Sequence, residues 1–319
     1  MNTQAIAMRD AFLDRVCQSM QDDDKVFFVS ADFGSPVLDR IRENFPARFI
    51  NVGIAEQNLI NISAGLAIEG FKVFAYAIAP FITMRCYEQI RVNLALLSEV
   101  RPMNVNLIGV GAGYSYVVSG PTHQCYEDIT VMRALPNVAV YSPADHIAAA
   151  ALLEPCLANL GPKYLRFDAQ ILPVIYYAVL PNLKMGFNIH ITGSDICMLA
   201  TGYMVHTALK VAARLQIIGL SIGVIDLFDI SHFDADELAQ VLASYKGLVT
   251  LEEGFKARGG VDAMMFNFIA QRRMHLRMLN LGVHGQYRFE LGDRLDLHEK
   301  AGIGESYVAK EIEKFAKLN

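Results

Sequence analysis

The stretch RFINVGIAEQNLINISAGLAIE, residues 48–69, decides the fold because it combines one short apolar strand with one amphipathic helix. The run Arg48–Val52 has the length and composition of a strand that is covered on both faces. In Ala55–Glu69, apolar side chains recur every three or four residues, as they do on one face of a helix. A strand that leads directly into a helix is the repeating unit of an α/β domain.

The same alternation extends to both sides of this stretch. Residues 8–20 carry an apolar side chain every four positions, which predicts an opening amphipathic helix. Further short apolar runs, mostly separated by segments of helix length, predict strands at Lys25–Ser30, Lys72–Ala77, Met103–Val110, Val138–Tyr141 and Tyr164–Phe167. We therefore expect residues 1–170 to form a doubly wound α/β domain.

A second domain of the same class is predicted after a linker. Residues 171–190 contain prolines and a glycine without a clear period, which is typical of a linker. Strand and helix patterns then resume, with strands expected at Ile196–Ala200, Ile222–Asp226 and Gly247–Leu251 and a closing helix at Glu305–Phe315. Residues 191–319 are thus predicted to form a second doubly wound α/β domain.

The composition narrows the class of protein. A hydrophobic fraction of 53% is enough to bury two cores, and a net charge of −5 argues against a nucleic-acid or anionic-membrane surface. No apolar run reaches the roughly 18 residues of a membrane-spanning helix, and no signal-peptide pattern is recognised, so we expect a cytoplasmic protein without membrane contact. The five cysteines lack metal-ligand spacing and are expected to be reduced and packed.

Polar residues follow the predicted strands at the edge of the sheet where ligands of α/β proteins bind. Asp32 and Glu56 each come just after a strand, and His123 ends the long loop after another. On its own, a glutamate in the first turn of a helix often only stabilises the helix dipole, and a loop histidine is more often a surface residue. The neighbours Ile54 and Ala55 favour a Glu56 carboxylate held at an apolar junction.

Two further patterns are open to a structural or a functional interpretation. Phe81, Met84 and Tyr87 stand at i, i+3 and i+6 and so share one face of a predicted helix, although most such stripes belong to the core. Arg166 lies inside an apolar strand, where it either pairs with Asp168 or another acid at the strand end, or binds a phosphate through its forked guanidinium. No Walker motif and no strand-linked dinucleotide motif occurs, which argues against a nicotinamide dehydrogenase.

Six blocks of the sequence resemble the transketolase and deoxyxylulose-phosphate synthase family, in order and over nearly the whole chain. The blocks that resemble its pyrimidine-binding domain are Asn51–Gln57, Ser63–Ala67 and Ser119–Gln124. Those that resemble its C-terminal domain are Leu199–Val205, Leu248–Glu253 and Leu297–Ile303. The resemblance implies a transferase that uses thiamine diphosphate and Mg²⁺ to move a two-carbon ketol unit from a ketose, or a ketose phosphate, to an aldose.

The resemblance also implies which residues hold the cofactor. Glu56 would hydrogen-bond a ring nitrogen of the aminopyrimidine and so activate the cofactor, which itself supplies the chemistry. Phe81 would stack on the pyrimidine, with Met84 and Tyr87 completing its pocket. Asp32 would border the cofactor across a subunit interface.

For the substrate, the resemblance implies that the catalytic residue His123 contacts the donor end and that Arg166 binds the terminal phosphate. Two positions depart from the usual transketolase pattern, because Ser119 replaces an acidic residue and Gly111 replaces a histidine. Unmatched polar contacts dominate discrimination between related substrates, so we expect altered recognition of the sugar hydroxyls.

No segment resembles the part of the family that holds magnesium and the cofactor's diphosphate. The resemblance therefore implies a separate diphosphate-binding subunit of similar size, two copies of each chain in the complex, and no metal ligands in this chain. Two alternatives remain open. One is the β subunit of a 2-oxo acid dehydrogenase, which has the same two-domain plan; the other is a non-catalytic regulatory subunit that retains the fold.

Overall fold

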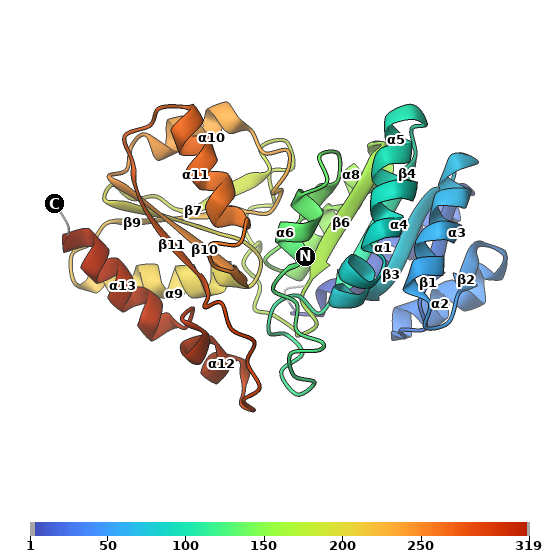
Figure 1. Cartoon of the computed structure of the whole chain (residues 1–319), viewed down its shortest axis with the longest axis horizontal. Helices are drawn as coiled ribbons and strands as arrows, with labels where there is room; N and C mark the ends of the chain where they lie inside the picture. Colours follow the sequence, from blue (N-terminus) through green and yellow to red (C-terminus); the bar gives the residue numbers. More distant parts are fainter. Residues whose placement is uncertain (1–3, 318–319) are drawn as a thin grey trace. The chain divides into compact units, whose positions relative to one another are not determined.

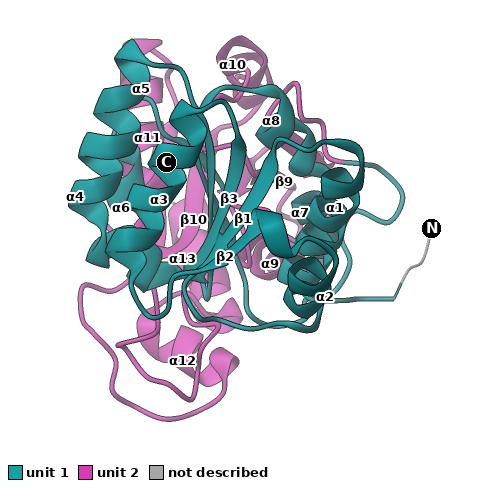
Figure 2. Cartoon of the chain, turned by 90° about the vertical axis from the view of Figure 1, so that its right-hand side faces the viewer, with its two compact units in different colours: residues 1–112, 131–141, 145–180 teal, residues 113–130, 142–144, 181–319 magenta. Residues whose placement is uncertain are grey.

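Two β-sheets organise residues 4–317, the part of the chain that the computed structural model describes. Each sheet belongs to one unit of the chain (Figure 2). Unit 1 comprises the residues up to 112 together with 131–141 and 145–180, and unit 2 comprises 113–130, 142–144 and the residues from 181 onward. Helices accompany both sheets, so the predicted α/β class with two domains is confirmed.

Unit 1 is built on a six-stranded parallel sheet with the strand order β2-β1-β3-β4-β6-β5 (Figure 1). Its strands are β1 (Val26–Ser30), β2 (Phe49–Asn51), β3 (Lys72–Ile78), β4 (Asn104–Val110), β5 (Ala139–Tyr141) and β6 (Gly161–Phe167). All six lie where the apolar runs predict strands. Every residue of β4 is buried, as expected for an inner strand covered on both faces.

Helices cover both faces of this sheet. Helix α3 (Glu56–Ile68) and the helical segment 81–100 lie on one face, and α1 (Met8–Asp22), α2 (Pro36–Asn44), α7 (His146–Ala151) and α8 (Leu153–Ala158) lie on the other (Figure 2). The predicted opening helix is α1, whose apolar stripe is buried. The short helix α6 (Asp128–Arg133) begins in unit 2 and ends in unit 1.

Unit 2 is built on a five-stranded mixed sheet with the order β11-β10-β8-β9-β7. Its strands are β7 (Phe187–Ile191), β8 (Ile196–Ala200), β9 (Ile222–Leu227), β10 (Gly247–Phe255) and β11 (Arg277–Val283). Only β7 runs antiparallel to its neighbour, β9. The helices are α9 (Met204–Ile217), α10 (Ala235–Leu242), α11 (Val261–Gln271), α12 (Arg294–Ala301) and α13 (Glu305–Lys317).

The two outer strands of this sheet, β7 and β11, differ from what the sequence predicts. Residues 187–190 are expected to belong to the linker but form most of β7, and β11 is not predicted at all. Both strands have only one neighbour in the sheet and mixed burial, so they lack the continuous apolar run by which an inner strand is recognised.

Two short segments from the first half of the chain, 113–130 and 142–144, belong to unit 2. Backbone hydrogen bonds hold them there. The amide of Ser142 donates to the carbonyl of Phe228 at 2.8 Å, and the amide of Phe255 donates to the carbonyl of Tyr126 at 3.3 Å. The domain boundaries drawn from the sequence at residues 170 and 190 stay a prediction.

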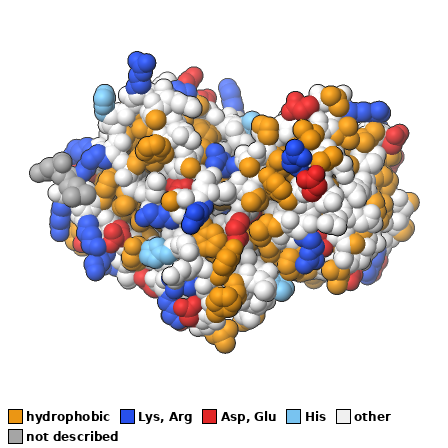
Figure 3. Space-filling model, in the orientation of Figure 1, with side chains coloured by type: hydrophobic (Ala, Val, Ile, Leu, Met, Phe, Trp, Pro, Cys, Tyr) orange, Lys and Arg blue, Asp and Glu red, His pale blue; other side chains and the backbone are white. Residues whose placement is uncertain are grey.

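The state of the cysteines and the distribution of surface charge are as expected from the composition. All five cysteines are free and buried, as expected. On the face shown in Figure 3, basic and acidic side chains are interspersed with apolar ones. Within residues 4–317, no helix is both long enough and apolar enough to cross a bilayer. The cytoplasmic location stays a prediction.

Candidate active site

Glu56 opens helix α3 directly after the turn that follows β2. In this turn Gly53 has a φ of +73°, a conformation that glycine adopts without strain. The residue before the helix, Ala55, has no side chain that could cap the helix. Glu56 is the acidic residue of the first turn, where a negative charge interacts favourably with the positive end of the helix dipole. The Glu56 residue is only 3% exposed. The sequence correctly places this glutamate in the first turn of a helix.

The Glu56 carboxylate is paired with Arg85. Nη1 of Arg85 donates to both carboxylate oxygens, at 3.0 Å to Oε1 and 2.9 Å to Oε2. The guanidinium carbon of Arg85 also lies 4.3 Å from the ring centroid of Phe81, a cation–π contact. One planar cation therefore contacts both Glu56 and Phe81, the residues expected to hold and stack on the aminopyrimidine.

The prediction that the Glu56 carboxylate is held at an apolar junction is wrong in one respect. Ile54 is 77% exposed and so does not cover the carboxylate. A charged partner, Arg85, lies there instead, although the sequence does not indicate it. Arg85 is 29 positions away from Glu56 and stands next to Met84, outside the predicted apolar stripe.

The segment that carries Phe81, Met84 and Tyr87 is an irregular helix. Phe81–Arg85 and Ile90–Leu96 are π-helical, with a short α-helical turn between them. Because π-helical hydrogen bonds join residues i and i+5, a spacing of three and six residues does not define a common face here. The prediction of a single regular α-helix from this spacing is therefore wrong, because the segment alternates between π-helical and α-helical turns. Such π-helical bulges are frequent at functional sites.

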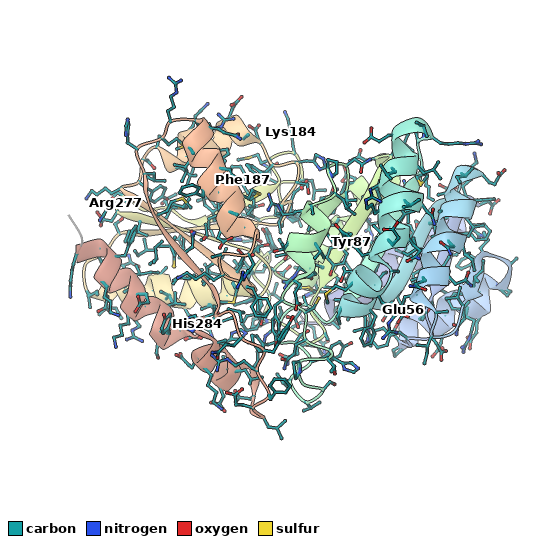
Figure 4. The ribbon with its side chains drawn as sticks, viewed as in Figure 1. Glu56, Tyr87, Lys184, Phe187, Arg277 and His284 are labelled. Carbon is teal, nitrogen blue, oxygen red and sulfur yellow. The ribbon has the colours of Figure 1, made fainter. Side chains whose placement is uncertain are left out.

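The three side chains of this segment differ in exposure. Met84 is 39% exposed, whereas Phe81 and Tyr87 are half-buried. The Tyr87 hydroxyl donates to the backbone carbonyl of Val131 at 3.0 Å, which fixes the ring. Figure 4 labels Tyr87 and Glu56, which come from the helical face of unit 1 formed by α3 and α4 (Tyr87–Gln89). Their cofactor contacts stay predictions.

Asp32 lies at the same edge of the sheet as Glu56, after strand β1. Its φ of +51° is a left-handed conformation that aspartate tolerates better than most residues. The amide of Asn51 donates to Asp32 Oδ1 at 3.0 Å, and Asn51 Oδ1 accepts from the backbone amides of Asp32 (3.2 Å) and Gly53 (2.9 Å). Asn51 therefore ties the Asp32 turn to the turn that leads into Glu56. A small hollow of about 80 Å³ lies beside Asp32 and Phe33.

Arg166 is buried in strand β6, with 2% of its surface exposed. Its register partner on β4 is Gly109, and Asp168 follows at the end of the strand, also buried. The carboxylate of Asp168 accepts from the backbone amide of Gln170 at 2.8 Å. The phosphate contact expected of Arg166 stays a prediction.

His123 lies in the loop before α6, within the segment 113–130 that belongs to unit 2, whereas the other six predicted site residues belong to unit 1. Its Nδ1 lies 3.0 Å from the hydroxyl oxygen of Thr122. The His123 ring meets the ring of Tyr116 edge-on, at 6.3 Å between centroids. These contacts orient the imidazole within its own loop.

A buried ionic cluster in unit 2 holds the beginning of this loop. Glu253, near the end of β10, accepts from Nη2 of Arg294 at 2.7 Å, and its Oε1 lies 2.5 Å from Nε2 of His298. The backbone amide of Tyr114 donates to the same Oε1 at 3.0 Å. Arg294 also lies over the ring of Tyr203, with its guanidinium carbon 3.7 Å from the centroid.

This cluster is not predicted from the sequence as a functional feature. Glu253 and His298 do stand in the blocks Leu248–Glu253 and Leu297–Ile303 that resemble the family, which was the available signal. Burial by itself would raise the pKa of Glu253. The charges of Arg294 and His298 and their hydrogen bonds outweigh burial and hold the pKa well below its usual range.

Among the described residues, no group of three or more His, Cys, Asp and Glu side chains is arranged to hold a metal ion.

Comparison with protein families assigns each of the two domains to a known domain family. Residues 4–174 match the transketolase pyrimidine-binding domain, and residues 187–307 match the transketolase C-terminal domain. The chain belongs to the transketolase family. This confirms the resemblance stated from the sequence, including the order of the two domains.

Relatives of this transketolase-family chain include proteins of similar length. One of the subunits of the apulose-4-phosphate transketolase of Phocaeicola vulgatus is 29% identical over 286 residues, which cover 88% of this chain and 90% of that protein. The 6-deoxy-6-sulfo-D-fructose transketolase subunit of Clostridium sp. (strain MSTE9) is 28% identical over 96% of this chain and 92% of that protein. A solved structure described as "split gene transketolase, inactive beta4 tetramer" superposes with a TM-score of 0.87 at 27% identity, covering 99% of both chains.

Proposed function

We propose that this chain is the pyrimidine-binding subunit of a two-chain, thiamine-diphosphate-dependent enzyme that transfers a two-carbon ketol unit from a ketose to an aldose. The observation that carries the proposal is the buried Glu56 carboxylate at the start of α3, which one planar group joins to the ring of Phe81. In a chain of the transketolase family, this pair supports the assignment of Glu56 as the activating carboxylate and Phe81 as the stacking ring.

The residues around Glu56 fit an aminopyrimidine. The guanidinium of Arg85 is planar, carries nitrogen atoms, hydrogen-bonds the carboxylate and lies against the aromatic ring. A pyrimidine ring with an amino group can make the same two kinds of contact. Glu56 would then hold a hydrogen bond to a ring nitrogen, while Met84 and Tyr87 border the ring. The bound thiamine diphosphate would supply a nucleophilic carbon that adds to the ketose carbonyl, so that the neighbouring carbon–carbon bond can be cleaved.

A separate subunit completes the proposed site. Two relatives that this chain matches over most of their length are named as transketolase subunits. We therefore assign the diphosphate and Mg²⁺ to a partner chain and propose a complex with two copies of each. Asp32, exposed at the carboxyl edge of the sheet, would border the cofactor at this subunit interface. The relatives named as transketolase subunits favour this assignment over a 2-oxo acid dehydrogenase β subunit.

The substrate is proposed to be a sugar with an anionic end group. The names of two relatives specify a sugar phosphate and a sulfonated sugar. In this assignment Arg166 binds the anionic end of the sugar and His123 contacts its donor carbonyl end, as the family resemblance implies. Ser119 and Gly111, which replace an acid and a histidine, would alter the recognition of hydroxyl groups between these two ends.

Ketol transfer by the reconstituted two-chain complex tests the proposal. Because Glu56→Gln removes the proton-sharing carboxylate, we expect a loss of at least about a hundredfold in kcat. Glu88→Gln is a matched control, since Glu88 lies on α4 with a side chain that is 70% exposed, and it should leave the rate unchanged. Full activity of Glu56→Gln would refute the role of Glu56. Cofactor binding and turnover by this chain alone would refute the two-chain assignment.

A further inference from the structure

Arg85 occupies the contact positions that the proposed function gives to the cofactor's pyrimidine. Its Nη1 hydrogen-bonds both oxygens of Glu56, and its guanidinium lies 4.3 Å from the centre of the Phe81 ring. A pyrimidine that hydrogen-bonds the same carboxylate and stacks on the same face of the ring would compete with the guanidinium for these contacts. The backbone of Arg85 is tied to the same helix, because Gln57 Nε2 donates to the Arg85 carbonyl at 3.3 Å.

The exposure of the pair shows which partner can move. The side chain of Arg85 is 45% exposed, whereas that of Glu56 is 3% exposed, so the arginine lies on the solvent side of the carboxylate. An arginine has a long flexible stem and a weakly hydrated head group, and it can rotate into water without repacking a core. Glu56 is fixed by its position in the first turn of α3.

An unloaded site needs a counter-charge for Glu56. A buried carboxylate without a hydrogen-bonded partner is strongly unfavourable, and Arg85 removes this penalty. The π-helical turn Phe81–Arg85 contributes, because it sets the guanidinium of its last residue over the ring of its first. When a pyrimidine hydrogen-bonds Glu56, the counter-charge is no longer required at that position.

We propose that Arg85 is a displaceable placeholder, which neutralises Glu56 in the unloaded chain and swings outward when the aminopyrimidine of thiamine diphosphate binds between Glu56 and Phe81. The inference rests on the proposed function. Since the Arg85 contacts must break before the cofactor contacts form, their free energy is subtracted from the affinity for the cofactor. Arg85 therefore stabilises the unloaded subunit and weakens cofactor binding.

A placeholder and a permanent structural ion pair predict opposite results for one substitution. In the two-chain complex, Arg85→Met keeps the apolar stem and removes the charge. We expect a lower unfolding temperature without cofactor, together with a Kd for thiamine diphosphate that is tighter by about tenfold, a usual size for coupled sites. Calorimetric titration in the presence of Mg²⁺ measures the Kd, and a thermal scan measures the unfolding temperature. An unchanged or weaker Kd would overturn the placeholder.

Two further variants keep the test decisive. Arg91→Met removes an arginine of the same segment. The Arg91 side chain is 51% exposed, and its Nη1 lies 3.8 Å from Oε1 of Glu88. This variant should change neither the Kd nor the unfolding temperature. If Arg85→Met does not fold, Arg85→Lys should bind the cofactor more tightly than the wild type, because a point charge lacks the planar contact with Phe81. A weaker Kd for Arg85→Lys would also overturn the placeholder.

The double variant Glu56→Gln/Arg85→Met shows whether the two residues act on each other. The stability lost in Arg85→Met should be largely absent when Glu56 is already neutral, as a double-mutant cycle would reveal. An equal loss in both backgrounds would contradict the inference. The proposed function fails separately, because in that case the wild-type complex itself would not bind thiamine diphosphate.

Discussion

Nε2 of His298 lies 2.5 Å from Oε1 of Glu253, and both side chains are 1% exposed. The same carboxylate pairs with Arg294. It also accepts a hydrogen bond from the backbone amide of Tyr114, the second residue of the segment that carries His123. A buried ionic cluster of unit 2 therefore holds one end of this segment. His298, Glu253 and Arg294 therefore fix the position of the Tyr114 backbone near the start of this segment.

We expect Glu253→Gln to destabilise the protein strongly. The substitution leaves the buried charge of Arg294 without its carboxylate, and breaking a buried ion pair in this way costs about 3–5 kcal/mol of unfolding free energy. Urea denaturation measures the loss. Glu305→Gln serves as a control, because the exposed pair of Glu305 with Lys210 should contribute less than about 1 kcal/mol. Similar losses for the two variants would contradict the importance of the cluster.

The contribution of Glu253 should depend on pH in the acid range. Burial alone would raise the pKa of this carboxyl, but Arg294 and His298 set it below its ordinary value of 4.5. A lowered folded-state pKa gives stability that is fully present above the unfolded value and is lost as the pH falls toward the folded value. The stability gap between wild type and Glu253→Gln should therefore narrow below about pH 4.5. A constant gap from neutral to acid pH would contradict this.

Gly113→Ala should displace the His123 loop at its first residue. Gly113 has a φ of +55°, and a methyl group there would lie 2.0 Å from a carboxylate oxygen of Glu253. We expect a loss of more than about 1 kcal/mol in unfolding free energy, together with a reduced rate of ketol transfer by the complex. Gly285→Ala is the matched control, since open space surrounds that position. Wild-type stability of Gly113→Ala would argue against a fixed loop.

The six strands of unit 1 and the inner strands β8, β9 and β10 of unit 2 could be predicted because they form short continuous apolar runs. Glu56 could be placed because a helix start is a local pattern of a strand, a turn and an amphipathic stretch. The outer strands β7 and β11 could not be predicted, because their apolar pattern is broken.

The partners of the site residues could not be predicted. The contact of Arg85 with Glu56 spans 29 positions and depends on π-helical turns that the sequence pattern does not reveal. The contact of His298 with Glu253 spans 45 positions and joins a helix to the end of a strand. Local periodicity places each side chain on its own element but carries no information about which charges meet.

The assignment of residues 113–130 and 142–144 to unit 2 means that the backbone passes between the two units repeatedly. A truncation at residue 170 would therefore not release an intact half. It would keep Tyr114 and Tyr126 but remove Glu253 and Phe255, to which their backbones are hydrogen-bonded, and so would expose two buried aromatic rings. Separate expression of either half is expected to yield an aggregating fragment, since the order of residues along the chain and the order of their packing do not coincide.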